Sequence, residues 1–307
     1  MRELGVGWFR FDVPWRELAP LRPGGDRYDR NAASSADWGG YRWEPLDRII
    51  DCLAEASISP LPVVSNTPDW AMGEDAFDPA APPSRPEFFE DLARALVARY
   101  RGKVSHWELW NEPDHPHSWS GSLAEYVRLV LEPGAHSVWG GGPECRVLLG
   151  GLADHRNLES LHRAGGASLY DVASVHHYPS KACLRHVRRA VNHVRSVARD
   201  GGRSGSDPRP VWLTECGIAT RPPSSPSGFG GTTDESGQAS FVQSLYTTVP
   251  ADAIFLYQLR DTAIVDCHGR TLKEVYWGLV SSDSRRRKAA FAAYQEAVTP
   301  VRAFRSG

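Results

Sequence analysis

The strongest constraint on the fold is an alternation of short apolar segments with segments of helical periodicity along the chain. Strand character is found in residues 4–13, 60–65, 104–110, 146–151, 171–177, 210–215 and 253–259, and helical character in residues 44–56, 86–100, 122–139, 182–199, 238–248 and 287–298. This alternation is typical of an α/β fold with a parallel sheet. The 307 residues suit one (β/α)8 barrel, which typically needs about 250 residues. We therefore expect a single domain over residues 1–307.

One of these strands runs into a cluster of polar residues. In VSHWELWNEPDHPHSW, residues 104–119, the strand reaches Asn111 and Glu112 and stops, because Pro113 cannot continue a central strand. A plain turn would explain these residue types. Neighbouring side chains on a strand point to opposite faces, so Asn111 and Glu112 can share a site only where the strand bends or ends. The nearby tryptophans make the surroundings apolar, and such surroundings raise the pKa of a carboxyl group and suit it to donate a proton near neutral pH.

A second glutamate ends another apolar strand. In RPVWLTECGIAT, residues 209–220, Glu215 follows three apolar residues and Gly217 lets the chain turn. In a (β/α)8 barrel the active site lies at the C-terminal ends of the strands, so both glutamates are candidates for catalysis. Glycoside cleavage needs two carboxyl groups that face one cleft: one protonates the leaving oxygen and the other attacks the anomeric carbon.

The motif WELWNEP, followed further along by WLTECG, resembles the retaining glycoside hydrolases of clan A, most of all families 39 and 5, which include β-xylosidases and cellulases. The resemblance extends from LGVGWFRFDVPW to YWGLVSSDSRRRKAAFAAYQEAV. It implies a TIM barrel that hydrolyses β-linked glycosides through a covalent intermediate, with no cofactor and no metal. It also implies that Glu112 is the acid/base, that Glu215 is the nucleophile, and that Asn111 hydrogen-bonds the sugar 2-hydroxyl. The two carboxyl groups would then lie about 5–5.5 Å apart.

Three more segments match the clan. WFRFD resembles its second strand, whose arginine lies near the nucleophile; here this is Arg10, and a fixed cation there would keep Glu215 ionised, although an ordinary ion pair is the alternative. SVHHYP resembles the sixth strand and supplies His176 and Tyr178. The resemblance places Tyr178 within hydrogen-bond reach of the nucleophile, while His177 would face away.

IFLYQLRD resembles the eighth strand, where many members of the clan carry a tryptophan under the bound sugar. This chain has Tyr257 in that region, so the identity of the aromatic platform is open. The third strand, SPLPVVSNTPDW, has Asn66 where family 5 usually has a histidine. This difference favours a likeness to family 39 over one to family 5.

Three tryptophans follow predicted strands and are expected to rim the cleft, where a flat ring suits the apolar face of a sugar: Trp15, Trp70 and Trp119. Packing in the core is the alternative for each of them.

Two other classes of function stay open. A metal-dependent barrel hydrolase would use His115, His117, His176 and His177, although the HPH pair lacks a third ligand at a regular spacing. A barrel that binds sugar without turnover would tolerate Glu112→Gln and Glu215→Gln.

The composition limits which classes of binding partner are expected. The formal net charge of −2 provides no overall field that would attract nucleic acid or an anionic membrane, so we expect a glycoside or polysaccharide as the partner. No stretch approaches the roughly 20 apolar residues of a membrane span. No signal peptide is visible, which indicates a cytoplasmic protein unless the true chain starts upstream. The five cysteines are scattered and odd in number, so free thiols are expected at Cys52, Cys145, Cys183, Cys216 and Cys267.

Two segments carry more specific expectations. The RRRK run at residues 285–288 is expected to be the solvated start of the last helix rather than a binding patch. The Pro/Ser/Gly-rich segment 221–237 follows the strand of Glu215, so it should lie over the cleft and shape access to it.

The first strand of the barrel is the feature we cannot find. Matched to the clan, LGVGWFRFD is the second strand and MREL the tail of the preceding helix, which leaves strands two to eight. An open barrel has unpaired strand edges, whereas a closed one has none. We expect a missing or non-standard first strand: either the true chain starts upstream, or a short strand within residues 22–40, a partner subunit or direct closure by strands two and eight fills the gap. The alternative is a first strand that is present but not recognisable in the sequence. A missing strand would lower stability and activity and favour self-association at the open edge.

Overall fold

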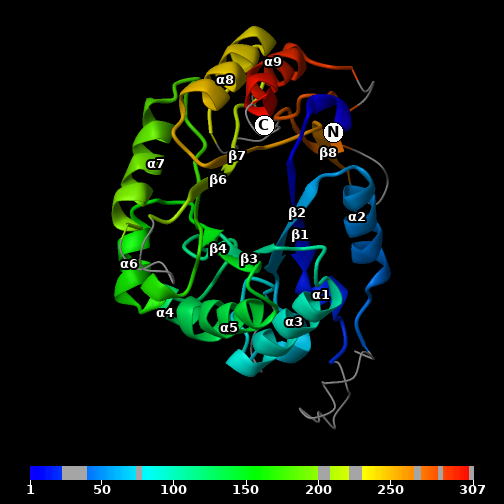
Figure 1. Cartoon of the computed structure of the whole chain (residues 1–307), viewed down its shortest axis with the longest axis vertical. Helices are drawn as coiled ribbons and strands as arrows, with labels where there is room; N and C mark the ends of the chain where they lie inside the picture. The colour runs from blue at the N-terminus through cyan, green and yellow to red at the C-terminus, as the bar shows by residue number, and fades with distance from the viewer. Residues whose placement is uncertain are drawn as a thin grey trace. The chain divides into compact units, whose positions relative to one another are not determined.

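The computed structural model describes residues 1–22, 40–73, 78–199, 208–220, 230–265, 271–282 and 286–303. The protein is α/β with parallel strands (Figure 1). It divides into two compact units. Unit 1 comprises Met1–Val6, Val175–His193 and Trp212–Gly307, and unit 2 comprises Gly7–Ser174 and Val194–Val211.

Unit 2 is built on a four-stranded parallel sheet in the order β1-β2-β3-β4. The strands are β1 (Trp8–Pro14), β2 (Ser59–Ser65), β3 (His106–Asn111) and β4 (Arg146–Gly151). All of β2 after its first residue is buried, as expected for a parallel strand that is covered on both faces. Because the strands are parallel, their C-terminal residues reach the same edge of the sheet, and Asn111 is paired there with Gly151.

The helical elements of unit 2 are α1 (Trp15–Leu18), α2 (Glu44–Glu55), η3 (Asp69–Ala71), α3 (Pro86–Arg99), α4 (Leu123–Tyr126), the π-helical turn η4 (Val127–Leu131), α5 (Glu132–Gly140), α6 (Asn157–Arg163) and η5 (Gly166–Ser168). Figure 1 shows α2, α3 and α5 beside the strands of this sheet. The predicted helix 122–139 is present as α4, η4 and α5 in succession, and it starts with a capping box between Ser122 and Glu125. Pro133, the second residue after the π-helical turn, has no N–H to donate, which gives a local reason for the irregularity.

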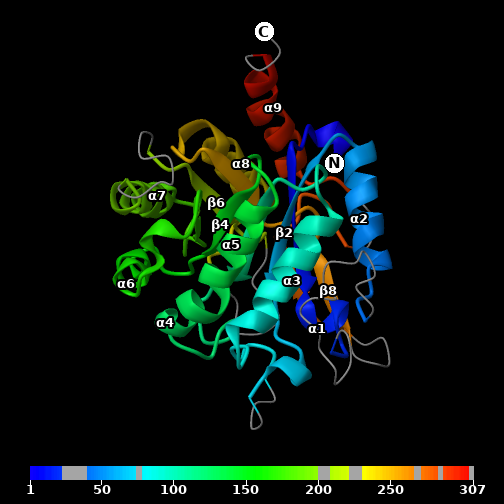
Figure 2. The same ribbon diagram turned by 60° about the horizontal axis from the view of Figure 1, so that its bottom comes forward.

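A second sheet has the strand order β5-β6-β7, with β5 (Ala173–His176), β6 (Val211–Cys216) and β7 (Ala253–Leu256). Unit 1 contains β7, the second half of β5 and all of β6 except Val211. Strands β6 and β7 are parallel, and β8 (Thr262–Val265) and β9 (Thr271–Val275) form a separate antiparallel pair. The helical elements of unit 1 are η1 (Arg2–Leu4), α8 (Glu235–Thr248), α9 (Ala289–Ala303) and α7 (Arg185–Val197) as far as His193. Figures 1 and 2 show α8 and α9 side by side, and η1 contacts α9.

All seven predicted strands are present, with ends that differ by a few residues. The first begins at Trp8 rather than at residue 4, because Arg2–Leu4 forms a 3-10 helix. Helix α6 and the β8–β9 pair were not predicted, since their segments are too short to show a periodicity. Most of residues 22–40, one candidate for a closing strand, lies outside the described residues. Closure of the barrel and the single domain stay predictions.

The last helix starts after the RRRK run rather than within it. Helix α9 begins at Ala289, one residue after the run. Arg286 and Arg287 make ion pairs with Glu235 and Glu3, and Lys288 is only 4% exposed. The expectation was therefore wrong for Lys288, whose surroundings are described below. Arg285 and residues 221–229 lie outside the described residues.

Candidate active site

The backbone around Glu112 leaves the regular strand geometry at the end of β3. Trp110 has a φ of 78° and Glu112 a φ of 45°, both in the left-handed region that non-glycine residues rarely adopt. The amide of Glu112 donates to the carbonyl of Gly151 (3.1 Å), so the turn stays attached to the end of β4. A Cβ at Gly150 would lie 2.8 Å from the carbonyl oxygens of Leu109 and Trp110, so the close approach of the two strands requires a glycine.

A buried ion pair fixes the side chain that precedes Glu112. Arg10 donates to Glu108 through Nε (2.6 Å) and Nη2 (3.1 Å), and Nη2 also donates to Oδ1 of Asn111 (2.7 Å). Glu108 is 0% exposed and accepts a further hydrogen bond from the amide of Gly151 (3.0 Å). Sequence reasoning missed Glu108; the available signal was a carboxylate between Trp107 and Leu109 in a strand. We call Arg10, Glu108, Asn111 and Glu112 the β3 cluster.

Asp114, the last residue of the N-E-P-D stretch, anchors the segment that follows β4. Its carboxylate accepts hydrogen bonds from the amides of Ala153 and Asp154 (both 2.9 Å) and from Nδ2 of Asn157 (3.0 Å). Asn157 is the first residue of α6. Asp114 therefore ties the turn that carries Glu112 to the start of the next helix.

Two of the three tryptophans expected at the rim of a cleft are buried. Trp15 is 0% exposed and packs edge-on against Trp70 and Phe89, and Trp119 is 2% exposed and packs against Trp110. The rim prediction is therefore wrong for Trp15 and Trp119, because a position after a strand does not determine the direction of the side chain. Trp70 is half-buried, and its Nε1 donates to the carbonyl of Ala19 (2.8 Å).

In unit 1, Glu215 lies at the penultimate position of β6 with its side chain 14% exposed. The hydroxyl of Tyr178 donates to Oε2 of Glu215, so the expected hydrogen bond is present. Nδ1 of His176, a residue that is 1% exposed, lies 3.7 Å from the same oxygen. The amide of His177 donates to the carbonyl of Glu215 (3.0 Å).

Two aromatic residues of unit 1 adjoin Tyr178. Tyr257 is 39% exposed, and its ring meets that of Tyr178 at a centroid distance of 6.0 Å and an angle of 86°. Trp277, which sequence reasoning did not single out, lies 5.1 Å from the Tyr178 ring at 83° and is only 8% exposed. We call His176, Tyr178, Glu215, Tyr257 and Trp277 the β6 cluster. Within it, Tyr257 is the residue with an accessible ring. Arg10 belongs to unit 2 and Glu215 to unit 1, so their predicted pairing stays a prediction.

The cysteines of the described residues behave as expected. Cys52, Cys145, Cys183 and Cys216 are free, and Cys267 lies outside the described residues. Cys216, the neighbour of Glu215, is fully buried, and this burial raises the pKa of its thiol well above the usual range. A thiol held in its protonated form is a weak nucleophile, which agrees with a packing role.

His115 and His117 lie with ring centroids 5.3 Å apart. Among the described residues, neither belongs to a group of three side chains close enough to hold a metal ion together. Within the same part of the chain, no helix is long and apolar enough to cross a bilayer.

Comparisons with known proteins identify the fold. No family model matches the sequence. A stretch of 150 residues is 23% identical to β-glucosidase 11 of Oryza sativa subsp. japonica. This match covers 48% of this chain and 25% of the rice protein. A family 39 glycoside hydrolase from the gut symbiont Bacteroides cellulosilyticus WH2 matches with a TM-score of 0.69 at 17% identity, over 98% of this chain and 59% of that chain. A family 1 β-glucosidase from Thermotoga maritima matches with a TM-score of 0.61 at 13% identity, over 97% of this chain and 84% of that chain.

Glycoside hydrolases of families 5 and 2 are also among the structural matches. The fold therefore resembles that of clan A glycoside hydrolases, as the motifs indicated. It is an α/β arrangement with parallel strands like that of TIM-barrel glycosidases. The chain spans less than two thirds of the length of the rice and family 39 proteins.

Proposed function

We propose that the protein is a retaining glycoside hydrolase that cleaves β-linked glycosides, with Glu215 as the nucleophile and Glu112 as the acid/base. The observation that carries this proposal is the β6 cluster, in which a carboxylate at a strand end accepts a hydrogen bond from Tyr178. A donor on the charged form stabilises the carboxylate, and a nucleophile must be ionised to attack. The fold, which resembles that of several glycosidase families, supports the same chemistry.

The proposed reaction has two steps. In the first, the Glu215 carboxylate attacks the anomeric carbon, the bond from this carbon to the leaving oxygen breaks, and the Glu112 carboxylic acid gives its proton to that oxygen. In the second, the Glu112 carboxylate takes a proton from water, the water oxygen bonds to the anomeric carbon, and Glu215 is released as a carboxylate. This sequence retains the anomeric configuration and requires the carboxyl groups to be about 5–5.5 Å apart.

The other members of the two clusters have proposed substrate-binding roles. Asn111 is half-buried and held by Arg10, so its amide nitrogen is oriented to donate to the sugar 2-hydroxyl. Tyr257 offers an accessible ring for a sugar face, and Trp70 is the remaining candidate of the predicted rim. His176 and Arg10 are proposed to order the charges around the substrate.

The decisive experiment is the stereochemistry of the product. A panel of aryl β-glycosides and polysaccharides, incubated with the wild-type protein and followed by proton NMR, should release the β-anomer first and the α-anomer only by later mutarotation. An α-anomer as the first product would overturn the retaining mechanism. Binding of sugars without turnover, unchanged in Glu112→Gln and Glu215→Gln, would instead establish a sugar-binding protein. Activity that is lost on chelation and restored by a divalent metal would establish the metal-dependent alternative.

A further inference from the structure

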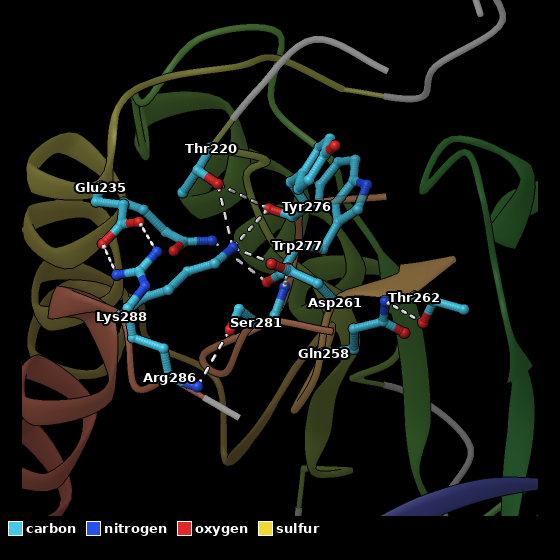
Figure 3. Close-up of polar contacts among 12 residues, drawn as sticks. Thr220, Glu235, Gln258, Asp261, Thr262, Tyr276, Trp277, Ser281, Arg286 and Lys288 are labelled. Carbon is cyan, nitrogen blue, oxygen red and sulfur yellow. Dashed lines mark hydrogen bonds and ion pairs between the residues drawn. The ribbon is translucent and has the colours of Figure 1, made fainter. Parts of the chain in front are cut away.

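A buried ion pair in unit 1 lies next to the backbone of Trp277 (Figure 3). Nζ of Lys288 donates to Oδ1 of Asp261 (2.8 Å), and the two side chains are 2% and 4% exposed. Lys288 immediately precedes α9, and Asp261 immediately precedes β8. Removing two charges from water costs several kcal/mol per ion, so such a pair adds little net stability compared with apolar side chains of similar volume. The contacts that it makes with its neighbours are therefore the informative feature.

The pair holds the two peptide groups on either side of Trp277. Nζ of Lys288 donates to the carbonyl of Tyr276 (3.3 Å), and Oδ1 of Asp261 accepts from the amide of Gly278 (2.7 Å). An ammonium and a carboxylate can bind a carbonyl and an amide at the same time, which an apolar pair cannot do. Lys288 also donates to Oγ1 of Thr220 (3.1 Å), whose amide donates to the same Tyr276 carbonyl (2.9 Å).

The indole ring of Trp277 has little freedom once its backbone is held. A Cβ at Gly217 would lie 3.0 Å from its Cε3, and a Cβ at Gly230 would lie 2.9 Å from its Cη2. The ring therefore fits between two residues that have no side chain. The Cβ at Gly230 would also lie 3.1 Å from Cβ of Tyr178, so the packing continues to the residue that donates to Glu215.

We infer that the Lys288–Asp261 pair is a positioning device for Glu215. The pair fixes the backbone on both sides of Trp277, the indole packs edge-on against the Tyr178 ring, and Tyr178 in turn orients the carboxylate. The inference rests on the proposed function for its catalytic consequence, whereas the geometric link between the pair and the Tyr178–Glu215 bond is independent of it. Trp277 is too buried to serve as a stacking platform itself, so its contribution is to hold Tyr178.

The test separates positioning from plain stability by removing the charges together. Lys288→Met and Asp261→Leu alone each leave one buried charge unpaired, and each should lower the Tm by about 5–10 °C. The double variant Lys288→Met/Asp261→Leu has no unpaired charge and should recover part of this loss, because the amide of Gly278 still loses its acceptor. Its kcat should nevertheless stay about 10-fold or more below that of the wild type, with KM changed less than kcat, because Tyr178 and Glu215 are no longer held for the transition state.

A matched control is the Arg286–Glu235 pair, which is bidentate (3.0 and 2.6 Å), lies in the same unit and is largely exposed. Arg286→Gln/Glu235→Gln should leave kcat within about twofold of the wild type, because exposed pairs contribute little. A double variant Lys288→Met/Asp261→Leu with wild-type Tm and wild-type kcat would overturn the inference. If this variant does not fold, Trp277→Phe decides: a tenfold loss in kcat supports the inference, and a wild-type kcat refutes it.

A readout without turnover keeps the two proposals apart. In a crystal structure of the double variant or of Trp277→Phe, the Tyr178–Glu215 hydrogen bond should be lengthened or lost. An unchanged bond would refute the positioning role, whatever the activity. Failure of the wild type to hydrolyse any glycoside would refute the proposed function. The length of the Tyr178–Glu215 hydrogen bond in the variants would still show whether the Lys288–Asp261 pair positions Tyr178.

Discussion

The β3 and β6 clusters each place a glutamate at the end of a parallel strand, but they control it in different ways. At β6, side chains act on the carboxylate itself, through the hydroxyl of Tyr178 and the nearby imidazole of His176. At β3, the Glu112 backbone is held by Gly151, and the ion pair of Arg10 and Glu108 fixes the neighbouring Asn111.

This difference matches two different chemical tasks. A nucleophile has to stay ionised, and a hydrogen bond donated to its carboxylate favours that form. An acid/base has to lose and regain a proton in every cycle, and the proposal gives this task to Glu112. The hydrogen bond that Tyr178 donates to Glu215 therefore supports the proposed role of Glu215 as the nucleophile.

The largest effect is expected when the Glu215 carboxylate is removed. Glu215→Ala should lower kcat by more than about 10⁴-fold, because no covalent intermediate can form. Azide should restore turnover and give a glycosyl azide of inverted configuration, which NMR identifies. A control for folding is the Tm, which should stay near that of the wild type. Residual wild-type activity, or an azide product of retained configuration, would contradict the assignment.

Glu112→Ala should have a smaller effect that depends on the substrate. Loss of a general acid typically costs about 10²–10⁴-fold, and the full loss is expected only for leaving groups that need a proton. Dinitrophenyl glycosides should therefore be cleaved almost normally in the first step, while phenyl or alkyl glycosides are not. Measured kcat/KM values for a series of leaving groups test this dependence. An equal decrease in kcat/KM for all leaving groups would contradict the acid/base role of Glu112 and would indicate a role in substrate binding.

Much of this organisation could be predicted, because the signals are local. Seven strands follow from apolar segments bounded by turn residues, and both glutamates stand where Pro113 or Gly217 ends a strand. The Tyr178–Glu215 hydrogen bond followed from a likeness to a family rather than from a pattern.

The residues that were missed depend on partners far away in the sequence. Glu108 is an unexpected charge in a buried strand until it is paired with Arg10, which lies 98 residues earlier. Lys288 looks like part of a solvated basic run, and only Asp261, reached through the tertiary fold, explains its burial. The tryptophans show the same limit, since Trp15 and Trp119 follow strands but point into the core. Sequence patterns identify the end of a strand more readily than the direction of a side chain.

Tyr178→Phe tests whether the β6 cluster acts through its hydroxyl group. Loss of a hydrogen bond to a charged group costs about 1.5–3 kcal/mol, which corresponds to a decrease in kcat of roughly 10–100-fold. The control is Tyr246→Phe, which removes a buried hydroxyl that donates to the carbonyl of Ile254 (3.3 Å) in the same unit. Tyr246→Phe should affect the Tm but not kcat. Equal kinetic losses in the two variants would mean that Tyr178 contributes only packing.

The smallest effect is expected at His106, which lies at the N-terminal end of β3, whereas Glu112 follows its C-terminal end. Burial, with Arg146 nearby, lowers the pKa of His106 from 6.5 to about 4, so the ring is neutral in the folded protein at pH 5 but protonated in the unfolded chain. The contribution of His106 to the free energy of unfolding should therefore be fully present above pH 6.5 and be lost as the pH decreases towards 4. After allowance for the partial exposure of the ring, this loss is roughly 2 kcal/mol.

His106→Phe tests this prediction, because it keeps a ring against Trp8, where the centroids lie 4.9 Å apart. In urea unfolding experiments this variant should lose less stability than the wild type between pH 6.5 and 4, whereas a variant of the exposed His186 should follow the wild type. Because His106 begins β3 and Asn111 ends it, the variant should leave the pH dependence of kcat unchanged. A kinetic change as large as that of Tyr178→Phe would show that the whole of β3, and not its C-terminal end alone, controls Glu112.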